Sequence, residues 1–318
     1  MDKVFNLSKA AAAAYVMYKL VKLGLTDSDL LTYECALNKV YFRDKIVWIT
    51  GASSGIGKEI ATQLSKLDVG VKLILSARRK KELEKLSEML ECESAVVPVD
   101  LFELDSLEAV AESALAAFGR VDILFNNGGI STRALAENTD FSVDEKIMKI
   151  DYLSYVKLTK LVLPQMIERR SGHIVNMSSL AGKLGSPMRS AYSGAKFALI
   201  GHFDSLRLEL ARYDIHVTNI CPGSVQTEVD KNALTSTGNS FGIEDPDIRN
   251  GMTVSRAADR MLAAISNDKH EVWLFGNTLQ KIVCYMAQYM PTIAKAVTMK
   301  QADKLVQNAE KLMRKSAH

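Results

Sequence analysis

From about residue 45 onward, short runs of apolar residues alternate with longer stretches in which apolar residues recur every three or four positions. The short runs predict strands at 45–50, 71–76, 95–99, 121–125, 172–178, 215–221 and 270–275. The longer stretches predict helices near 55–67, 79–91, 103–118, 143–170, 190–212 and 253–266. Near-continuous apolar strands separated by helices are typical of a parallel sheet covered on both faces. The pattern therefore predicts an α/β fold with one doubly wound parallel sheet of about seven strands.

The two ends of the chain have a different pattern, so we divide it into 1–43, 44–275 and 276–318. The uncharged run at 10–18 is shorter than the roughly 20 residues of a membrane-spanning helix. An amphipathic helix packed on the body, a helix on a membrane surface and a weak anchor all fit it. The last part predicts an amphipathic helical extension that fits a membrane surface, a dimer face or a core helix; its apolar residues at helical spacing are Leu279, Ile282, Val283, Met286 and Met290.

Charge and cysteine content narrow the class of protein. The chain has 40 Lys and Arg against 37 Asp and Glu, and a net charge of +3 is too small to predict a nucleic-acid partner. The excess lies at the ends, with four lysines against one aspartate in residues 1–25 and six basic against two acidic residues in 291–318. The four cysteines are far apart and no histidine cluster has metal spacing, so we expect neither a metal site nor disulfides. Reduced thiols fit the cytosol or a surface facing it.

A glycine-rich turn directly follows the first predicted strand and opens the first helix of the sheet. Its sequence is Gly51-Ala52-Ser53-Ser54-Gly55-Ile56-Gly57. Backbone N–H groups and a helix N-terminus at such a turn suit a pyrophosphate. We therefore expect residues 51 and 53–57 to bind a dinucleotide.

Taken with Thr50, this spacing resembles the TGxxxGxG motif of the short-chain dehydrogenase/reductase family. Further family motifs follow in order: Asn126-Asn127-Gly128-Gly129, which has Gly where the family's NNAG has Ala; Ser179; a YxxxK motif at Tyr192–Lys196; and Pro222-Gly223 with Thr227. The resemblance covers roughly 44–275. It implies a Rossmann-type fold and makes 44–275 a dinucleotide-binding catalytic domain.

The resemblance implies Ser179, Tyr192 and Lys196 as the catalytic residues. YxxxK also occurs at Tyr15, Tyr18 and Tyr41, so the order of motifs along the chain is what selects Tyr192. Residues i and i+4 share one helix face, so the Lys196 ammonium can approach the phenol and favour its ionised form. Tyr192 can then exchange a proton with a carbonyl or alcohol oxygen that Ser179 orients. One departure concerns Asp151, which stands where the family usually has a catalytic Asn and adds a negative charge near Lys196.

The second predicted strand ends without the carboxylate that NAD enzymes place near the ribose 2′-hydroxyl. Arg78 follows it instead and suits a 2′-phosphate, so we expect NADP(H) rather than NAD(H). The alternative is that Arg78 and Arg79 simply face solvent. The resemblance also implies Asp100 and Leu101 beside adenine and Asn127 in the cofactor site. It further implies Lys196 on the nicotinamide ribose and Thr227 near the carboxamide.

Several local phrases, among them SARR, CPGSVQT and YMPT, look like the dehydrogenase/reductase member 7 and 7B subgroup. That resemblance implies a reductase of lipophilic carbonyls such as steroids, retinoids or lipid ketones. It also implies membrane association, with the endoplasmic reticulum expected and the cytoplasm as the alternative, and a homodimer. The competing hypothesis is a dinucleotide-binding sensor or scaffold of the same fold without turnover.

Overall fold

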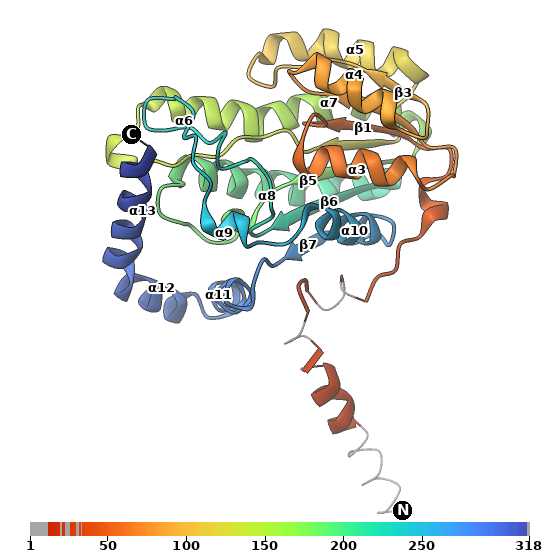
Figure 1. The fold of residues 1–318 in the computed structure, drawn as a ribbon. Coiled ribbons are helices and arrows are strands. Elements are labelled where there is room, and N and C mark those ends of the chain that lie inside the picture. The colour runs from red at the N-terminus through yellow and green to blue at the C-terminus, as the bar shows by residue number, and fades with distance from the viewer. Residues whose placement is uncertain (1–11, 20, 23–25, 30–31, 33, 317–318) are drawn as a thin grey trace, which may run out of the picture.

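The computed structural model describes residues 12–19, 21–22, 26–29, 32 and 34–316. Its centre is one parallel sheet of seven strands in the order β3-β2-β1-β4-β5-β6-β7 (Figure 1). The strands are β1 (Ile46–Thr50), β2 (Lys72–Ser76), β3 (Ser94–Val96), β4 (Ile123–Asn126), β5 (Gly172–Met177), β6 (Ile215–Pro222) and β7 (Glu271–Leu274). The predicted doubly wound α/β fold is confirmed.

The helices that connect and flank the strands follow the predicted order. They are α3 (Gly55–Ser65), α4 (Lys80–Met89), α5 (Leu107–Phe118), α6 (Phe141–Met148), α7 (Ser154–Arg169), α8 (Ser190–Leu210), α9 (Pro246–Arg249), α10 (Val254–Ile265), α11 (Thr278–Tyr289), α12 (Pro291–Lys300) and α13 (Ala302–Ser316). The chain first builds the sheet outward from β1 to β3 and then returns to add β4 on the other side of β1. In such sheets ligands bind at the carboxyl ends of the strands, beside this reversal.

Alternate residues of β1 enter two separate apolar cores, one on each face of the sheet. Val47 and Ile49 pack with residues of α3, α4 and α10, whereas Ile46 and Trp48 pack with residues of α5, α7 and α8. All five residues of β1 are buried. Because both faces are covered, the strand is apolar throughout instead of alternating, and this is why the sequence pattern revealed it.

Two predicted elements differ from the observed ones. The third strand ends at Val96 instead of 99, although the N–H of Val97 still donates to Leu75 in β2 and the N–H of Val99 to Ala77 just after it. Pro98 lies between them at the sheet edge, where its missing N–H is tolerated. The single helix predicted at 143–170 is three elements, because a π-helical turn at Lys149–Leu153 joins α6 to α7.

Parts of both terminal segments lie near β7, whereas the N-terminal helix lies away from the sheet and α13 lies at the side of the molecule near α6 (Figure 1). Residues 12–19 and 21–22 are helical, and residues 26–29 run antiparallel to β7 through the pair Ser28–Leu274. Among the described residues, the helices are too short or too polar to cross a bilayer. The apolar stripe of α11 is not a core face, since Leu279 is 68% exposed and Ile282 50%, and Cys284 on another face of the helix is buried.

Candidate functional site

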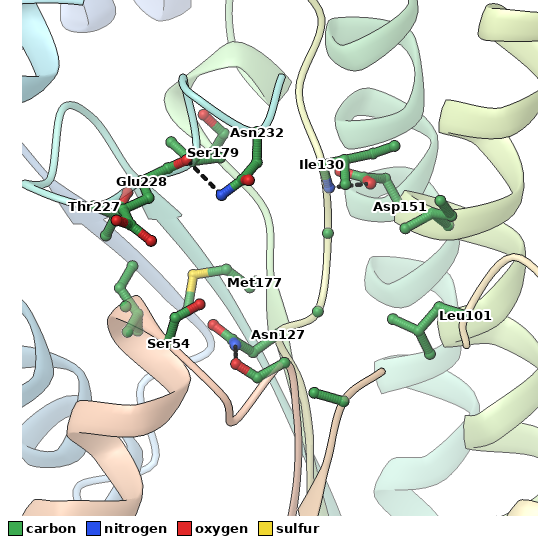
Figure 2. A pocket seen from close by; sticks show the side chains of 18 of the residues that line it. Ser54, Leu101, Asn127, Ile130, Asp151, Met177, Ser179, Thr227, Glu228 and Asn232 are labelled. Atoms are coloured by element: carbon green, nitrogen blue, oxygen red, sulfur yellow. Dashed lines mark hydrogen bonds between the residues drawn. The ribbon is translucent and has the colours of Figure 1, made fainter. Parts of the chain in front are cut away.

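A cavity of about 340 Å³ lies at the carboxyl ends of the strands. It brings together every residue predicted for catalysis or cofactor binding except Gly57. The predicted residues that line it are Gly51, Ser53, Ser54, Gly55, Ile56, Arg78, Asp100, Leu101, Asn127, Asp151, Ser179, Tyr192, Lys196 and Thr227. Figure 2 shows Ser179, Thr227 and Asn232 on one wall, with Ile130 and Asp151 across from them. Residues far apart in sequence therefore form one continuous site.

The glycine turn depends on glycine for two distinct reasons. Gly51 has φ +68°, a left-handed conformation that side chains disfavour, and a Cβ there would lie 2.7 Å from the Cα of Gly128. Gly57 is buried beneath the turn, where a Cβ would lie 2.6 Å from the backbone oxygen of Gly51. Gly57 thus lets α3 pack closely against the turn without itself lining the cavity.

Thr50, the last residue of β1, ties the glycine turn to the segment after β4. Its Oγ1 donates to the backbone oxygen of Phe125 at 3.3 Å. The Oγ1 of Thr50 also accepts the N–H groups of Asn127 at 2.9 Å and Gly128 at 3.0 Å. Asn127 returns the contact, because its Nδ2 donates to the backbone oxygen of Thr50 at 2.9 Å. These bonds hold the two loops at the sheet's switch point in one arrangement.

Ser179 and Tyr192 reach the cavity from the segment after β5 and from α8. The Ser179 hydroxyl accepts the N–H of Ala181 at 3.1 Å and donates to the backbone oxygen of Pro222 at 3.3 Å. Tyr192 is half-buried in the first turn of α8, so its phenol can meet a ligand in the cavity. Lys196 lies one turn further along, with its Nζ 5.6 Å from the centre of the Tyr192 ring.

Lys196 is buried and its ammonium is held by oxygen atoms. Its Nζ donates to the backbone oxygen of Met177 at 2.9 Å and lies 3.1 Å from Oδ2 of Asp151. Asp151 is fully buried, and its Oδ1 accepts the N–H of Ile130 at 2.9 Å. Complete burial alone would lower the pKa of Lys196, but Asp151, Tyr155 and Tyr192 together outweigh this, so the pKa of the ammonium lies above its usual value. Burial also raises the pKa of the Asp151 carboxyl, against the opposing effect of Lys196.

The other end of the cavity is basic. Arg78 and Arg79 are both exposed and follow β2 directly. The Nη2 of Arg79 donates to the hydroxyl of Ser53 at 3.1 Å, which links this arginine to the glycine turn. Asp100 and Leu101 form the neighbouring wall, where Oδ1 of Asp100 accepts the N–H of Phe102.

Sequence reasoning missed several residues of the cavity. The sequence predicts Arg79 only as a solvent-facing neighbour of Arg78, whereas its side chain contacts Ser53 in the glycine turn. Asn232 and Ile248 line the cavity from the long segment between β6 and α10, where no periodic pattern predicts contacts. Among the described residues, His, Cys, Asp and Glu side chains do not gather in groups of three that could hold a metal ion.

The residues of the cavity fit a nicotinamide dinucleotide. The glycine turn leaves its backbone open and presents the N-terminus of α3, which suits a pyrophosphate. Two arginines come after β2 on one side of β1, and a tyrosine and a lysine come from α8, which follows β5 on the other side of β1. A long ligand with an adenosine at one end, a pyrophosphate in the middle and a reactive ring at the other end matches this order.

Comparison with known proteins defines the class. Residues 45–237 match the family model described as short chain dehydrogenase. The chain belongs to the short-chain dehydrogenase/reductase family and is an oxidoreductase of that family.

Individual relatives place the chain near one subgroup. It is 44% identical over 273 residues to dehydrogenase/reductase SDR family member 7 of Homo sapiens, covering 83% of this chain and 80% of the relative. It is 39% identical over 264 residues to member 7B of Mus musculus, covering 81% and 80% of the two chains. Among solved structures, a short-chain dehydrogenase of Sphingobium yanoikuyae in complex with NADPH has a TM-score of 0.63 and 26% identity, covering 72% of this chain and 87% of that one.

Proposed function

We propose that this protein is an NADP(H)-dependent oxidoreductase that reduces a lipophilic ketone or aldehyde, or oxidises the corresponding alcohol. Steroids, retinoids and lipid ketones are the substrate classes. The observation that carries the proposal is that Tyr192 and Lys196 line the same cavity as the glycine turn. A proton donor and a dinucleotide cradle in one cavity are what carbonyl reduction requires.

Each of the predicted catalytic residues Tyr192, Ser179 and Lys196 has a separate role in this reaction. Tyr192 gives its proton to the carbonyl oxygen, and Ser179 donates a hydrogen bond to the same oxygen. The Lys196 ammonium stabilises the phenolate that remains, because opposite charges at short range favour each other. When bound, the reduced nicotinamide supplies a hydride to the carbonyl carbon. Thr227 would lie near the nicotinamide carboxamide, and Asn127 would contact the cofactor.

The preference for NADP(H) rests on charge at the adenine end of the cavity. Arg78 and Arg79 can each donate to a 2′-phosphate, and Asp100 is the acidic residue on the neighbouring wall. The NADPH complex of the Sphingobium relative agrees with this preference. Asp100 and Leu101 would contact the adenine.

The proposal includes a working division of the chain and a location. Residues 44–275 would form the dinucleotide-binding catalytic domain, between the extensions at 1–43 and 276–318. Apolar side chains exposed on α11 and α12, such as Leu279 and Ile293, and the exposed lysines 295 and 300 of α12 support contact with a membrane. The endoplasmic reticulum is the expected location and the cytoplasm the alternative. The exposed Phe197 and Leu208 on α8 support a homodimer.

A second candidate is a dinucleotide-binding sensor or scaffold, which Asp151 favours because its carboxylate faces the lysine on which catalysis depends. Purified protein should be mixed with NADPH and a panel of aromatic ketones, steroid ketones and retinaldehyde. Consumption of NADPH with at least one of them supports the reductase. NADPH binding without consumption across the whole panel would instead support the sensor.

A further inference from the structure

Arg133 is a buried cation outside the set of residues that line the cavity. It follows β4 and is 3% exposed. Its Nη1 donates to the hydroxyl of Ser131 and to the backbone oxygen of Thr132, both at 3.0 Å. Its Nη2 lies 3.5 Å from Oδ2 of Asp245, a residue 112 positions further along the chain. Neither the proposed reaction nor the cofactor requires this arginine.

Asp245 receives a second arginine at the same oxygen. The Nη2 of Arg189 lies 3.4 Å from Oδ2 of Asp245. Arg189 precedes α8, and its backbone oxygen accepts the N–H of Ser193 at 2.7 Å, in the turn that carries Tyr192. The three side chains therefore join the loop after β4, the start of α8 and the segment between β6 and α10. We call Arg133, Asp245 and Arg189 the loop cluster.

Within its own segment, Asp245 determines where the short helix α9 begins. It is the N-cap of α9, and its Oδ1 accepts the N–H of Asp247 at 3.0 Å. Its own N–H donates to the carboxylate of Asp230, which is fully buried. Three residues after Asp245, Ile248 is buried and lines the cavity. A shift of Asp245 would therefore move a wall of the cavity.

The rest of the segment is held by backbone bonds at its base and near its middle, whereas the end of α9 is bonded to the base through Gln226, whose Nε2 donates to the backbone oxygen of Arg249 at 3.1 Å. At the base, Gln226 donates to Met252 and Met252 donates to Ser224, both at 2.9 Å. Near the middle, Leu234 pairs with the loop after β4: its N–H donates to the backbone oxygen of Ser131 and its oxygen accepts the N–H of Arg133, both at 2.8 Å. The loop cluster is the ion-paired contact between α9 and the body.

Electrostatics agree with this geometry. Burial and the neighbouring Arg189 lower the pKa of Arg133 to about 10, and Asp245 and Asp230 oppose that shift. The positive charges of Arg133 and Arg189 are matched in number by the negative charges of Asp245 and Asp230. Removing the charge of Asp245 would leave a buried guanidinium without its counter-ion, which proteins relieve by moving the cation or its loop.

We propose that Arg133, Asp245 and Arg189 are positioning residues that hold α9 and Ile248 against the substrate end of the cavity. They thereby set the KM for the carbonyl substrate without taking part in the chemical step. The inference of a KM effect rests on the proposed carbonyl reductase function. The loop cluster lies beside the turn that carries Tyr192 and not beside Arg78 and Arg79, so we expect its effect on the carbonyl substrate and not on the adenine end of the cofactor.

The test compares Asp245→Asn with Asp247→Asn, an exposed aspartate on the same helix. Asparagine remains a good helix N-cap, so the first variant removes charge and little else. We expect Asp245→Asn to raise KM for the most rapidly reduced panel ketone by about tenfold or more, with kcat and NADPH affinity changed by less than about twofold. Asp247→Asn should match the wild type. Equal KM values in the two variants would overturn the proposal. A rise in KM accompanied by comparable falls in kcat and in NADPH affinity would overturn it as well.

Limited trypsin digestion gives a second measurement that does not depend on turnover. Lys231 and Arg249 are exposed cleavage sites that flank Asp245. Cleavage at these sites, followed by mass spectrometry, should be faster in Asp245→Asn than in Asp247→Asn. If the first variant does not fold, Arg189→Gln serves in its place, because Arg189 is partly exposed. Faster cleavage in a protein that reduces no ketone would contradict the proposed function and still support the loop cluster, whereas unchanged cleavage would contradict the loop cluster.

Discussion

Lys196 and Asp151 form an ion pair sealed inside the protein, with Nζ 3.1 Å from Oδ2 and both side chains at most 3% exposed. The π-helical turn at Lys149–Leu153 carries Asp151 to this position, and Ile130 holds its other oxygen. The lysine that would support Tyr192 therefore faces a counter-charge within the protein. The effect of the Asp151 carboxylate on ionisation of the Tyr192 phenol should be visible in the pH dependence of turnover.

Replacing Asp151 by Asn should move the pH profile of alcohol oxidation to lower pH. Without the carboxylate, the Lys196 ammonium acts on the Tyr192 phenol unopposed, and the phenolate needed as base forms more readily. We expect a displacement of about one pH unit, since one unit corresponds to about 1.4 kcal/mol, the size of a partly shielded charge interaction inside a protein. The measurement is kcat/KM for alcohol oxidation against pH. Glu145→Gln on α6, an exposed site, is the control, and coincident profiles would show that the Asp151 charge is irrelevant.

Replacing Arg78 or Arg79 should weaken selection of NADPH over NADH. A charge-assisted hydrogen bond contributes about 1.5–3 kcal/mol, so each alanine variant should lose roughly tenfold or more in kcat/KM for NADPH and little for NADH. Arg78→Asp should go further and favour NADH, because a carboxylate repels the 2′-phosphate. Lys80→Ala is the control at the next exposed position. A cofactor ratio that does not change in any of these variants would contradict the proposed NADP(H) preference.

His173 is a buried neutral histidine at the amino end of β5, at the opposite end of the strands from the cavity. The Thr218 hydroxyl donates to the backbone oxygen of Lys269 at 2.7 Å and so must accept from Nε2 of His173, 2.8 Å away. Nδ1 then accepts the hydroxyl of Tyr41 at 2.6 Å. Protonation would break that bond, and burial lowers the pKa of His173 to about 3.

Stability should therefore fall as the pH drops below the unfolded pKa of histidine, about 6.5. The folded pKa is the lower one, so acid favours the unfolded chain, by about 2 kcal/mol between pH 7.5 and pH 5 for this group. Urea unfolding at the two pH values should show this loss in the wild type and a smaller one in His173→Asn. If the variant does not fold, proton NMR of the wild type should show His173 neutral at about pH 5. Protonation near pH 6 would contradict the assignment.

Three asparagines on neighbouring strands form a buried ladder. Nδ2 of Asn126 donates to Asn176 at 3.0 Å, and Nδ2 of Asn176 donates to Asn219 at 3.1 Å. Asn176→Ala would leave polar groups unpaired on both sides, and we expect a loss of about 2–4 kcal/mol in the free energy of unfolding. Urea denaturation measures this loss. Asn138→Ala, at an exposed site, should cost little, and equal losses in the two variants would show that the ladder adds no stability.

The sequence predicted the sheet because its strands are buried on both faces, as in β1, and the glycine turn because its backbone needs residues without Cβ. It could not select Tyr192 from the spacing of YxxxK, which also fits Tyr15 and Lys19. Only the order of the motifs along the chain made that choice. The structure brings Tyr192 and Lys196 to the cavity, and their catalytic roles stay a prediction.

Other features left no local trace in the sequence. A π-helical turn has nearly the same apolar pattern as the α-helix around it, so the sequence did not predict the turn that places Asp151 beside Lys196. The contact between Arg79 and Ser53 depends on side-chain conformation. The pairing of Arg133 with Asp245 joins loops with no periodicity, and only the folded chain brings them together. The α11 stripe has the spacing of a core helix, yet residues such as Leu279 are exposed.

The most direct test is the rate of NADPH consumption with a panel ketone in Tyr192→Phe, measured beside NADPH affinity. We predict a fall of at least about a hundredfold in turnover, the usual contribution of a proton donor, with NADPH affinity changed by less than about threefold. Tyr15→Phe, which removes the phenol of another YxxxK pair, should match the wild type. Turnover of Tyr192→Phe equal to that of Tyr15→Phe would contradict the assignment of Tyr192 as the proton donor.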